Sequence, residues 1–149
     1  MKDSQIQLRG FRLTVTGYEF PEISPAESYH DANWLTLRVD IRTGEGGLHS
    51  SEACLLTWEL RDLAEQLELL SEPQQHRRWQ AQLKPLEPYL KLRFLQDETG
   101  LFFTVRLMVH TDESVQSFKV QWKVQDAELE EFRTQLNHLL RLFPIKEQP

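Results

Sequence analysis

A chain of 149 residues is long enough for one domain with a full hydrophobic core. Its apolar and charged fractions are ordinary, and no segment rich in proline, glycine or serine indicates a linker. We therefore expect a single domain over residues 1–149. The formal net charge of -6 disfavours general binding to nucleic acids or to anionic membranes. The lone Cys54 excludes an intramolecular disulfide, and because no apolar signal or membrane segment is visible, we expect a cytoplasmic protein without membrane contact.

The first half of the chain alternates between strand patterns and turns. Apolar and polar residues alternate over Phe11–Val15 and again over Leu35–Ile41, which predicts two strands that each bury one face. Two prolines make Pro21–Ser28 a surface loop, because proline supplies no backbone donor and restricts its neighbour. The glycines of Gly44–Gly47 predict a hairpin, from which the chain returns as a partner strand over Leu48–Leu56.

Two helices are expected next. Thr57 occupies an N-cap position, and acidic residues follow in the first turn, where the helix dipole favours them. Apolar residues recur behind it at intervals of three and four, which predicts an amphipathic helix. These residues are Leu60, Leu63, Ala64, Leu67 and Leu70. A second, short helix is predicted over Gln74–Leu83, before Pro85 and Pro88 stop it.

The second half of the chain predicts three neighbouring strands and a terminal helix. Period-two alternation covers Leu90–Phe94, Phe103–Val109 and Phe118–Val124, and consecutive strands usually pair with one another. Asp126 is the candidate N-cap of the last helix, which Pro144 closes. The apolar stripe of this helix consists of Leu129, Phe132, Leu136, Leu139, Leu140 and Phe143.

These elements together predict an α+β fold. We expect a mostly antiparallel β-sheet of about six strands, with helices, including the C-terminal one, covering its apolar face.

No group of residues typical of catalysis stands out. The chain lacks the nucleophile elbow, the P-loop and the dinucleotide-binding glycine pattern, and its histidines and single cysteine show no metal-ligand spacing. Adjacent carboxylates such as Glu130 and Glu131 lie on the polar side of a helix, where solvation leaves acid–base chemistry unsupported. We therefore expect no cofactor and no metal, and a hydrolase ranks below two binding functions.

Several short motifs, in order along nearly the whole chain, resemble bacterial immunity proteins of the WapI type. They are Tyr18-Glu19-Phe20-Pro21, Asp31-Ala32-Asn33-Trp34-Leu35, Leu56-Thr57-Trp58-Glu59-Leu60, Leu86-Glu87-Pro88-Tyr89-Leu90 and Phe143-Pro144. The family usually closes on proline, an apolar residue and arginine, whereas Lys146 stands in the last of these positions here.

The resemblance implies a protein that binds and neutralises a cognate toxin domain by stoichiometric protein–protein contact. If the toxin is a nuclease, its nucleic-acid groove is basic, so acidic loop residues with an aromatic neighbour are expected to bind it. These are Glu19, Glu22, Glu27, Tyr29 and Asp31. Asp31 alternatively forms, with Asn33 and Trp34, a corner that determines the fold. The sequence leaves the oligomeric state open.

The water-facing sides of the predicted strands are mostly basic. They carry Arg12, Arg38, Arg42, Lys91, Arg93, Arg106, Lys119 and Lys123 against Asp40 and Glu52. Long cationic side chains commonly occupy exposed strand faces and prevent edge aggregation. They also suggest an alternative function, the binding of an anionic ligand or, less expected at this net charge, of nucleic acid. That function would use Arg38, Arg42, Arg93, Arg106 and Lys123, and a purely structural or interaction domain is a further alternative.

Overall fold

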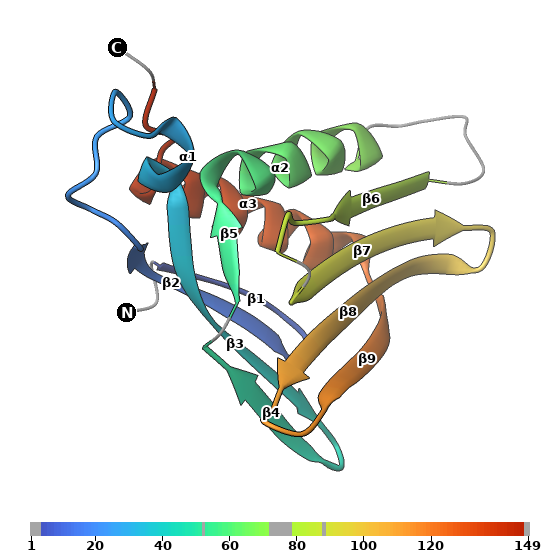
Figure 1. Ribbon diagram of the computed structural model, residues 1–149. Coiled ribbons are helices and arrows are strands. Elements are labelled where there is room, and N and C mark those ends of the chain that lie inside the picture. Colours follow the sequence, from blue (N-terminus) through green and yellow to red (C-terminus); the bar gives the residue numbers. More distant parts are fainter. Residues whose placement is uncertain (1–3, 52, 72–78, 88, 148–149) are drawn as a thin grey trace.

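The computed structural model describes residues 4–51, 53–71, 79–87 and 89–147, and this part of the chain forms two antiparallel sheets and three helices (Figure 1). The first sheet contains β1 (Gln5–Leu8), β2 (Phe11–Tyr18), β3 (Trp34–Thr43), β4 (Gly46–Ser50) and β5 (Cys54–Leu56). The second contains β6 (Trp79–Leu83), β7 (Leu90–Asp97), β8 (Gly100–His110) and β9 (Val115–Val124). The helices are α1 (Tyr29–Ala32), α2 (Thr57–Ser71) and α3 (Asp126–Leu142). The predicted α+β class is confirmed, although the strands are divided between two sheets.

The first sheet has the order β1-β2-β3-β4, and β5 pairs with the beginning of β3. The strand predicted over Leu48–Leu56 is therefore two strands on one edge of β3. The first, β4, pairs with Val39–Thr43, and β5 pairs with Trp34–Thr36. Glu52, expected on the water-facing side of that strand, lies outside the described residues. β1 was not predicted, because four residues are too short a segment for alternation to be recognised.

The second sheet is a meander with the order β6-β7-β8-β9, and the predicted pairing of three consecutive strands in this half is confirmed. The helix predicted over Gln74–Leu83 is wrong where it is described, because Trp79–Leu83 forms β6 and pairs with β7. Trp79 and Leu83 are spaced for a helix, but Ala81 between them is also buried, which is the period of a strand. The rest of that prediction, and Pro88 behind it, lies outside the described residues.

The buried side chains of both sheets and of α2 and α3 form one hydrophobic cluster. Its centre is aromatic: Phe103 of β8 stacks on Phe94 of β7 at 4.7 Å between centroids and meets Phe11 of β2 edge-on at 5.6 Å. Phe132 of α3 approaches Phe94 at 5.2 Å. Aromatic pairs of this geometry contribute about 1 kcal/mol each beyond their buried area. These four rings connect the two sheets and the terminal helix.

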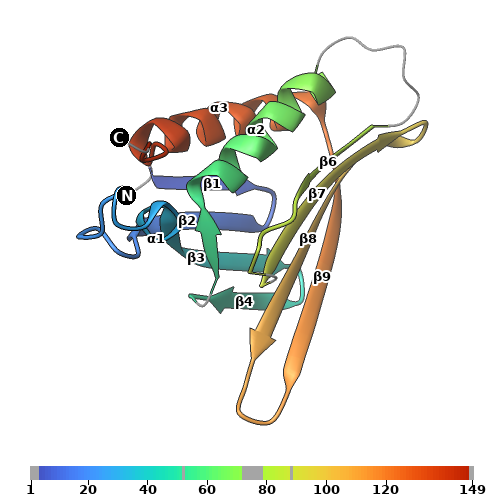
Figure 2. The same cartoon turned by 45° about the horizontal axis from the view of Figure 1, so that its top comes forward.

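The long helices lie across the top of the molecule and cover one edge of each sheet (Figure 2). On β1, the Gln7 N–H donates to Oε1 of Gln135 in α3 at 2.7 Å. On β6, the amide of Gln66 in α2 exchanges two bonds of 2.9 Å with the backbone of Gln82. An uncovered edge strand presents unpaired backbone groups that recruit other chains, so both glutamines protect the sheets from aggregation.

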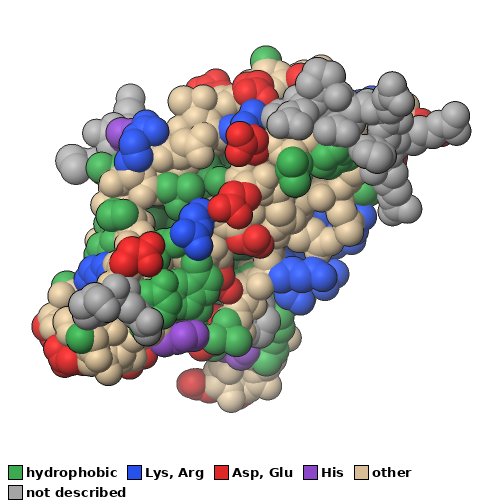
Figure 3. Space-filling view, turned by 90° about the horizontal axis from the view of Figure 1, so that it is seen from above, with side chains coloured by type: hydrophobic (Ala, Val, Ile, Leu, Met, Phe, Trp, Pro, Cys, Tyr) green, Lys and Arg blue, Asp and Glu red, His purple; other side chains and the backbone are tan. Residues whose placement is uncertain are grey.

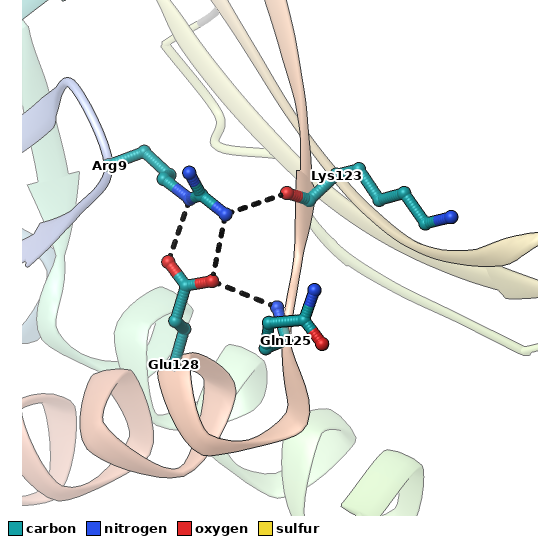
Figure 4. Close-up of polar contacts among 4 residues, drawn as sticks. All are labelled: Arg9, Lys123, Gln125 and Glu128. Carbon is teal, nitrogen blue, oxygen red and sulfur yellow. Dashed lines mark hydrogen bonds and ion pairs between the residues drawn. The ribbon is translucent and has the colours of Figure 1, made fainter.

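A single side chain joins the first sheet to the junction between β9 and α3 (Figure 4). Arg9, in the turn between β1 and β2, forms an ion pair of 2.7 Å with Glu128 and donates to the carbonyl of Lys123 at 3.1 Å. Glu128 also accepts the backbone N–H of Gln125 at 3.0 Å. Gln125 is therefore the N-cap of α3, and Asp126, predicted to be the cap, is the first helical residue.

Candidate functional site

The motifs that carry the family resemblance meet at one end of the molecule, around the buried Asn33. Its Oδ1 accepts the hydroxyl of Thr57 at 2.7 Å and the N–H of Lys146 at 2.8 Å. Its Nδ2 donates to the carbonyls of Tyr29 at 2.9 Å and Lys146 at 3.0 Å. Thr57 was expected to cap α2, but it is the first residue of the helix and its hydroxyl bonds to Asn33 instead. A fully satisfied buried amide of this kind fixes the three segments relative to one another.

Two further contacts extend this corner. The hydroxyl of Tyr18 donates to the carbonyl of Pro144 at 2.6 Å, and the Tyr18 ring meets Phe143 edge-on at 5.8 Å. Burial raises the pKa of Tyr18. The ammonium of Lys146 lies 4.0 Å from the centroid of the same ring, a cation–π contact.

Glu59 connects two other motif segments. One carboxylate oxygen accepts the N–H of Leu56 at 2.8 Å, immediately before α2, and the other accepts the N–H of Leu86 at 2.7 Å. Asn33, which was expected in a corner that determines the fold, and Glu59, which was not, therefore both join separate segments at this end of the molecule.

An aromatic pocket lies beside this corner. Tyr29 of α1 stacks on Trp58 of α2 at 5.1 Å between ring centroids, and His30 meets Trp58 edge-on at 5.3 Å. The pocket has a volume of about 410 Å³. Its lining residues, which define the aromatic pocket below, are Tyr29, Trp58, Glu59, Arg61, Asp62, Glu65, Leu83 and Lys84. Seen from above, the face carrying α2 shows carboxylates with cations between them, next to an apolar area (Figure 3).

Trp58 was not among the residues expected to bind a partner, although the sequence contains a signal for it. Trp58, Arg61, Asp62 and Glu65 are spaced by three and four residues, so they share the side of α2 opposite to its buried leucines. A tryptophan on the polar side of an amphipathic helix is not needed for the core, because the core stripe is already complete without it.

The expected acidic loop residues fall into two groups. Glu19, Glu22 and Glu27 are exposed, whereas Tyr29 and Asp31 are half-buried. Tyr29 joins the aromatic pocket, and Glu27 accepts the hydroxyl of Ser24 at 3.2 Å, which pins the loop. The backbone N–H of Asp31 donates to the Ser28 hydroxyl at 3.2 Å, which caps α1.

Cys54 of β5 is affected by two carboxylates. Burial raises the pKa of the Cys54 thiol, and the negative charges of Glu19 and Glu87 raise it further. This is the opposite of what a reactive cysteine requires, since the thiolate is the nucleophile.

The five residues of the alternative basic surface do not lie on one face. Arg38 and Arg42 belong to β3 in the first sheet, whereas Arg93, Arg106 and Lys123 belong to the second sheet. Arg38 forms an ion pair with Asp40 at 3.3 Å, so part of its charge is already balanced. The cations of the second sheet are clustered on the face that points away from the core.

Among the described residues no three histidine, cysteine, aspartate or glutamate side chains are placed to hold a metal ion. No helix in that same part of the chain is long and apolar enough to cross a membrane.

Comparison with protein families places these observations in context. A model of the immunity protein WapI-like family matches residues 3–144, nearly the whole chain. The chain belongs to this family. Neither the curated proteins nor the solved structures yield a match. Membership in the WapI-like family confirms the resemblance of the ordered motifs, and it indicates an immunity function with a protein partner.

Proposed function

We propose that this WapI-like chain neutralises a cognate toxin domain by forming a stoichiometric complex through the aromatic pocket and the acidic residues around it. The supporting observation is the half-exposed Tyr29–Trp58 stack at the surface of an immunity-family protein. Tryptophan and tyrosine dominate the binding energy of protein interfaces, because they bury large areas at a small cost in side-chain entropy.

The charges around the pocket favour a basic partner. Three carboxylates line it against the two cations Arg61 and Lys84, and the loop carrying Glu22 and Glu27 precedes α1. The chain as a whole has a formal net charge of -6, so a basic toxin domain is attracted over long range. Acidic residues at the rim accelerate association, whereas the buried aromatic centre determines how slowly the complex dissociates.

In the proposed mechanism the immunity protein blocks the toxin by occupying its surface. Blocking requires no cofactor and no catalytic residue, only an interface large enough to outcompete the substrate. A stable interface of this kind buries about 800 Å² on each partner, which exceeds the pocket alone. The loop and the exposed side of α2 provide the surrounding contact area.

The test is co-expression with the C-terminal domain of the protein encoded directly upstream, followed by size-exclusion chromatography with light scattering. We expect a one-to-one complex and restored growth of cells that produce the toxin domain. Trp58→Ala should weaken binding about 30-fold, the effect of an interface hot spot.

A charge-reversal pair tests whether the acidic residues near the pocket act locally or only through the net charge. Glu22→Arg with Glu65→Arg should slow association with a basic toxin domain. Glu98→Arg with Glu113→Arg makes the same change in net charge in two exposed turns of the second sheet and is the matched control. Equal effects of both pairs would show that the interface does not lie at the pocket. The same conclusion would follow if neither Trp58→Ala nor the first pair affected the complex.

A further inference from the structure

A row of three cations crosses the outer face of the second sheet. The strand register places Lys91 opposite Arg106, and Arg106 opposite Lys119. All three side chains are exposed and lie on the face opposite to the buried residues of β7 and β8. Neighbouring strands are about 4.8 Å apart, so the backbone positions of the three residues lie within about 10 Å of one another. We call these three residues the basic row.

The charges of the basic row are not balanced within the described part of the chain. None of the three residues takes part in an ion pair there, and their neighbours Thr104 and Gln121 bond to each other. Like charges directly opposite each other destabilise a strand pair. The first sheet shows the usual solution, because Arg12 and Arg38 both pair with Asp40 at 3.3 Å. The basic row lacks such a carboxylate.

Arg93 adds a buried donor to the same place. It lies on β7 two residues after Lys91 and opposite Thr104, and its Nε is shielded from solvent without a hydrogen-bond partner. A buried donor left without a partner is energetically unfavourable, so it favours a bound acceptor. Arg93 and the basic row line one depression of about 210 Å³, together with Lys84, Gln82, Leu83, Leu92 and Thr104. An anion bound in this depression would balance the positive charges and accept a hydrogen bond from the unpaired donor.

We propose that this depression binds the carboxylates of an acidic protein segment lying across the strands. The arginines can hold a carboxylate with two parallel bonds, and the lysines balance a second charge nearby. Carboxylates are favoured over nucleic-acid phosphates because none of the described residues that line the depression is an aromatic on which a base could stack. The site is separate from the aromatic pocket except for Leu83 and Lys84, which border both.

The test measures the fluorescence anisotropy of a labelled octaglutamate peptide titrated with the protein. The comparison probes are a labelled octathymidylate strand and a labelled peptide of alternating glutamate and lysine. We expect saturable binding of octaglutamate that is at least about tenfold tighter than that of either comparison probe and that weakens with salt. Tighter binding of the oligonucleotide, or no saturable binding of octaglutamate, would overturn the proposal.

Paired variants assign the binding to the depression. Arg106→Gln with Lys119→Gln should weaken octaglutamate binding at least about tenfold. Arg42→Gln with Arg141→Gln removes the same charge from exposed positions elsewhere and should leave binding nearly unchanged. An equal loss in both pairs would show that net charge alone attracts the peptide.

A stability measurement on the free protein gives an independent readout. Because the basic row is repulsive without an anion, Arg106→Gln should unfold at a temperature equal to or above that of the wild type. Octaglutamate should raise the melting temperature of the wild type but not of the paired variant. A lower melting temperature of Arg106→Gln in the absence of peptide would mean that the row stabilises the fold and would contradict the proposal.

Discussion

Asn33 and Lys146 exchange two hydrogen bonds although 113 positions separate them in the sequence. Both bonds use the backbone of Lys146, so they do not depend on its side chain. The ammonium group instead lies over the ring of Tyr18. An arginine, which the family usually has at this position, can keep both backbone bonds and also stack on an aromatic ring. The departure at Lys146 is therefore compatible with the same corner.

Replacing Asn33 by alanine should lower the free energy of unfolding by about 3 kcal/mol, because the Thr57 hydroxyl and the backbone of Lys146 lose their buried partner. Urea denaturation followed by tryptophan fluorescence measures the change. Lys146→Arg is the control and should stay within about 0.5 kcal/mol of the wild type. A loss below about 1 kcal/mol in Asn33→Ala would show that water replaces the amide.

Local features of the fold could be predicted from the sequence, whereas contacts between distant segments could not, and Asn33 illustrates both. A corner at Asn33 was expected from its position before a strand, but its bond to Lys146 joins segments whose proximity no local pattern encodes. β6 was misassigned for a related reason. Its spacing of apolar residues fits a helix or a strand. The segment is a strand because its backbone pairs with β7, a contact that the local sequence does not reveal. The amphipathic helices, in contrast, were predictable because each has a complete apolar stripe.

The binding surfaces were predictable to different degrees. The acidic loop and the basic strands are visible as charges in the sequence. The division of the basic residues between two sheets is not, because the predicted strands were placed in one sheet. The alignment of Lys91, Arg106 and Lys119 depends on strand register, which turn lengths and core packing determine together.

Glu59→Ala should destabilise the protein by about 2 kcal/mol, because two backbone N–H groups lose a charged acceptor. Glu65→Ala on the same helix is the matched control. Glu65 is exposed and its ion pair with Arg61 measures 3.9 Å, so its loss should cost no more than about 0.5 kcal/mol. Equal effects of the two substitutions would mean that helix propensity, rather than the bonds of Glu59, determines the result.

Gly10→Ala should be among the most damaging small substitutions. A Cβ at Gly10 would lie 1.8 Å from the carbonyl oxygen of Arg42, and that backbone is fixed by a bond of 2.8 Å from the Arg42 N–H to the Gly10 carbonyl. The turn between β1 and β2 would have to move away from β3, at a cost of about 3 kcal/mol. Gly44→Ala is the control, since nothing lies within 4 Å of its Cβ position, and thermal unfolding of the two variants compares them. A melting temperature of Gly10→Ala equal to that of Gly44→Ala would contradict the close approach.

The thiol of Cys54 should react slowly with alkylating reagents and gain reactivity at higher pH than a free cysteine. Burial and the charges of Glu19 and Glu87 raise its pKa, so less thiolate is present at a given pH. Glu19→Gln removes one negative charge, lowers the pKa and should increase the alkylation rate at pH 8. Glu22→Gln, a neighbouring exposed carboxylate that does not act on Cys54, is the control. The measurement is the rate of iodoacetamide labelling by mass spectrometry across a pH series, with the protein unfolded in guanidinium chloride as reference. A pH dependence identical to that of the unfolded protein would show that neither burial nor the two carboxylates acts on the thiol.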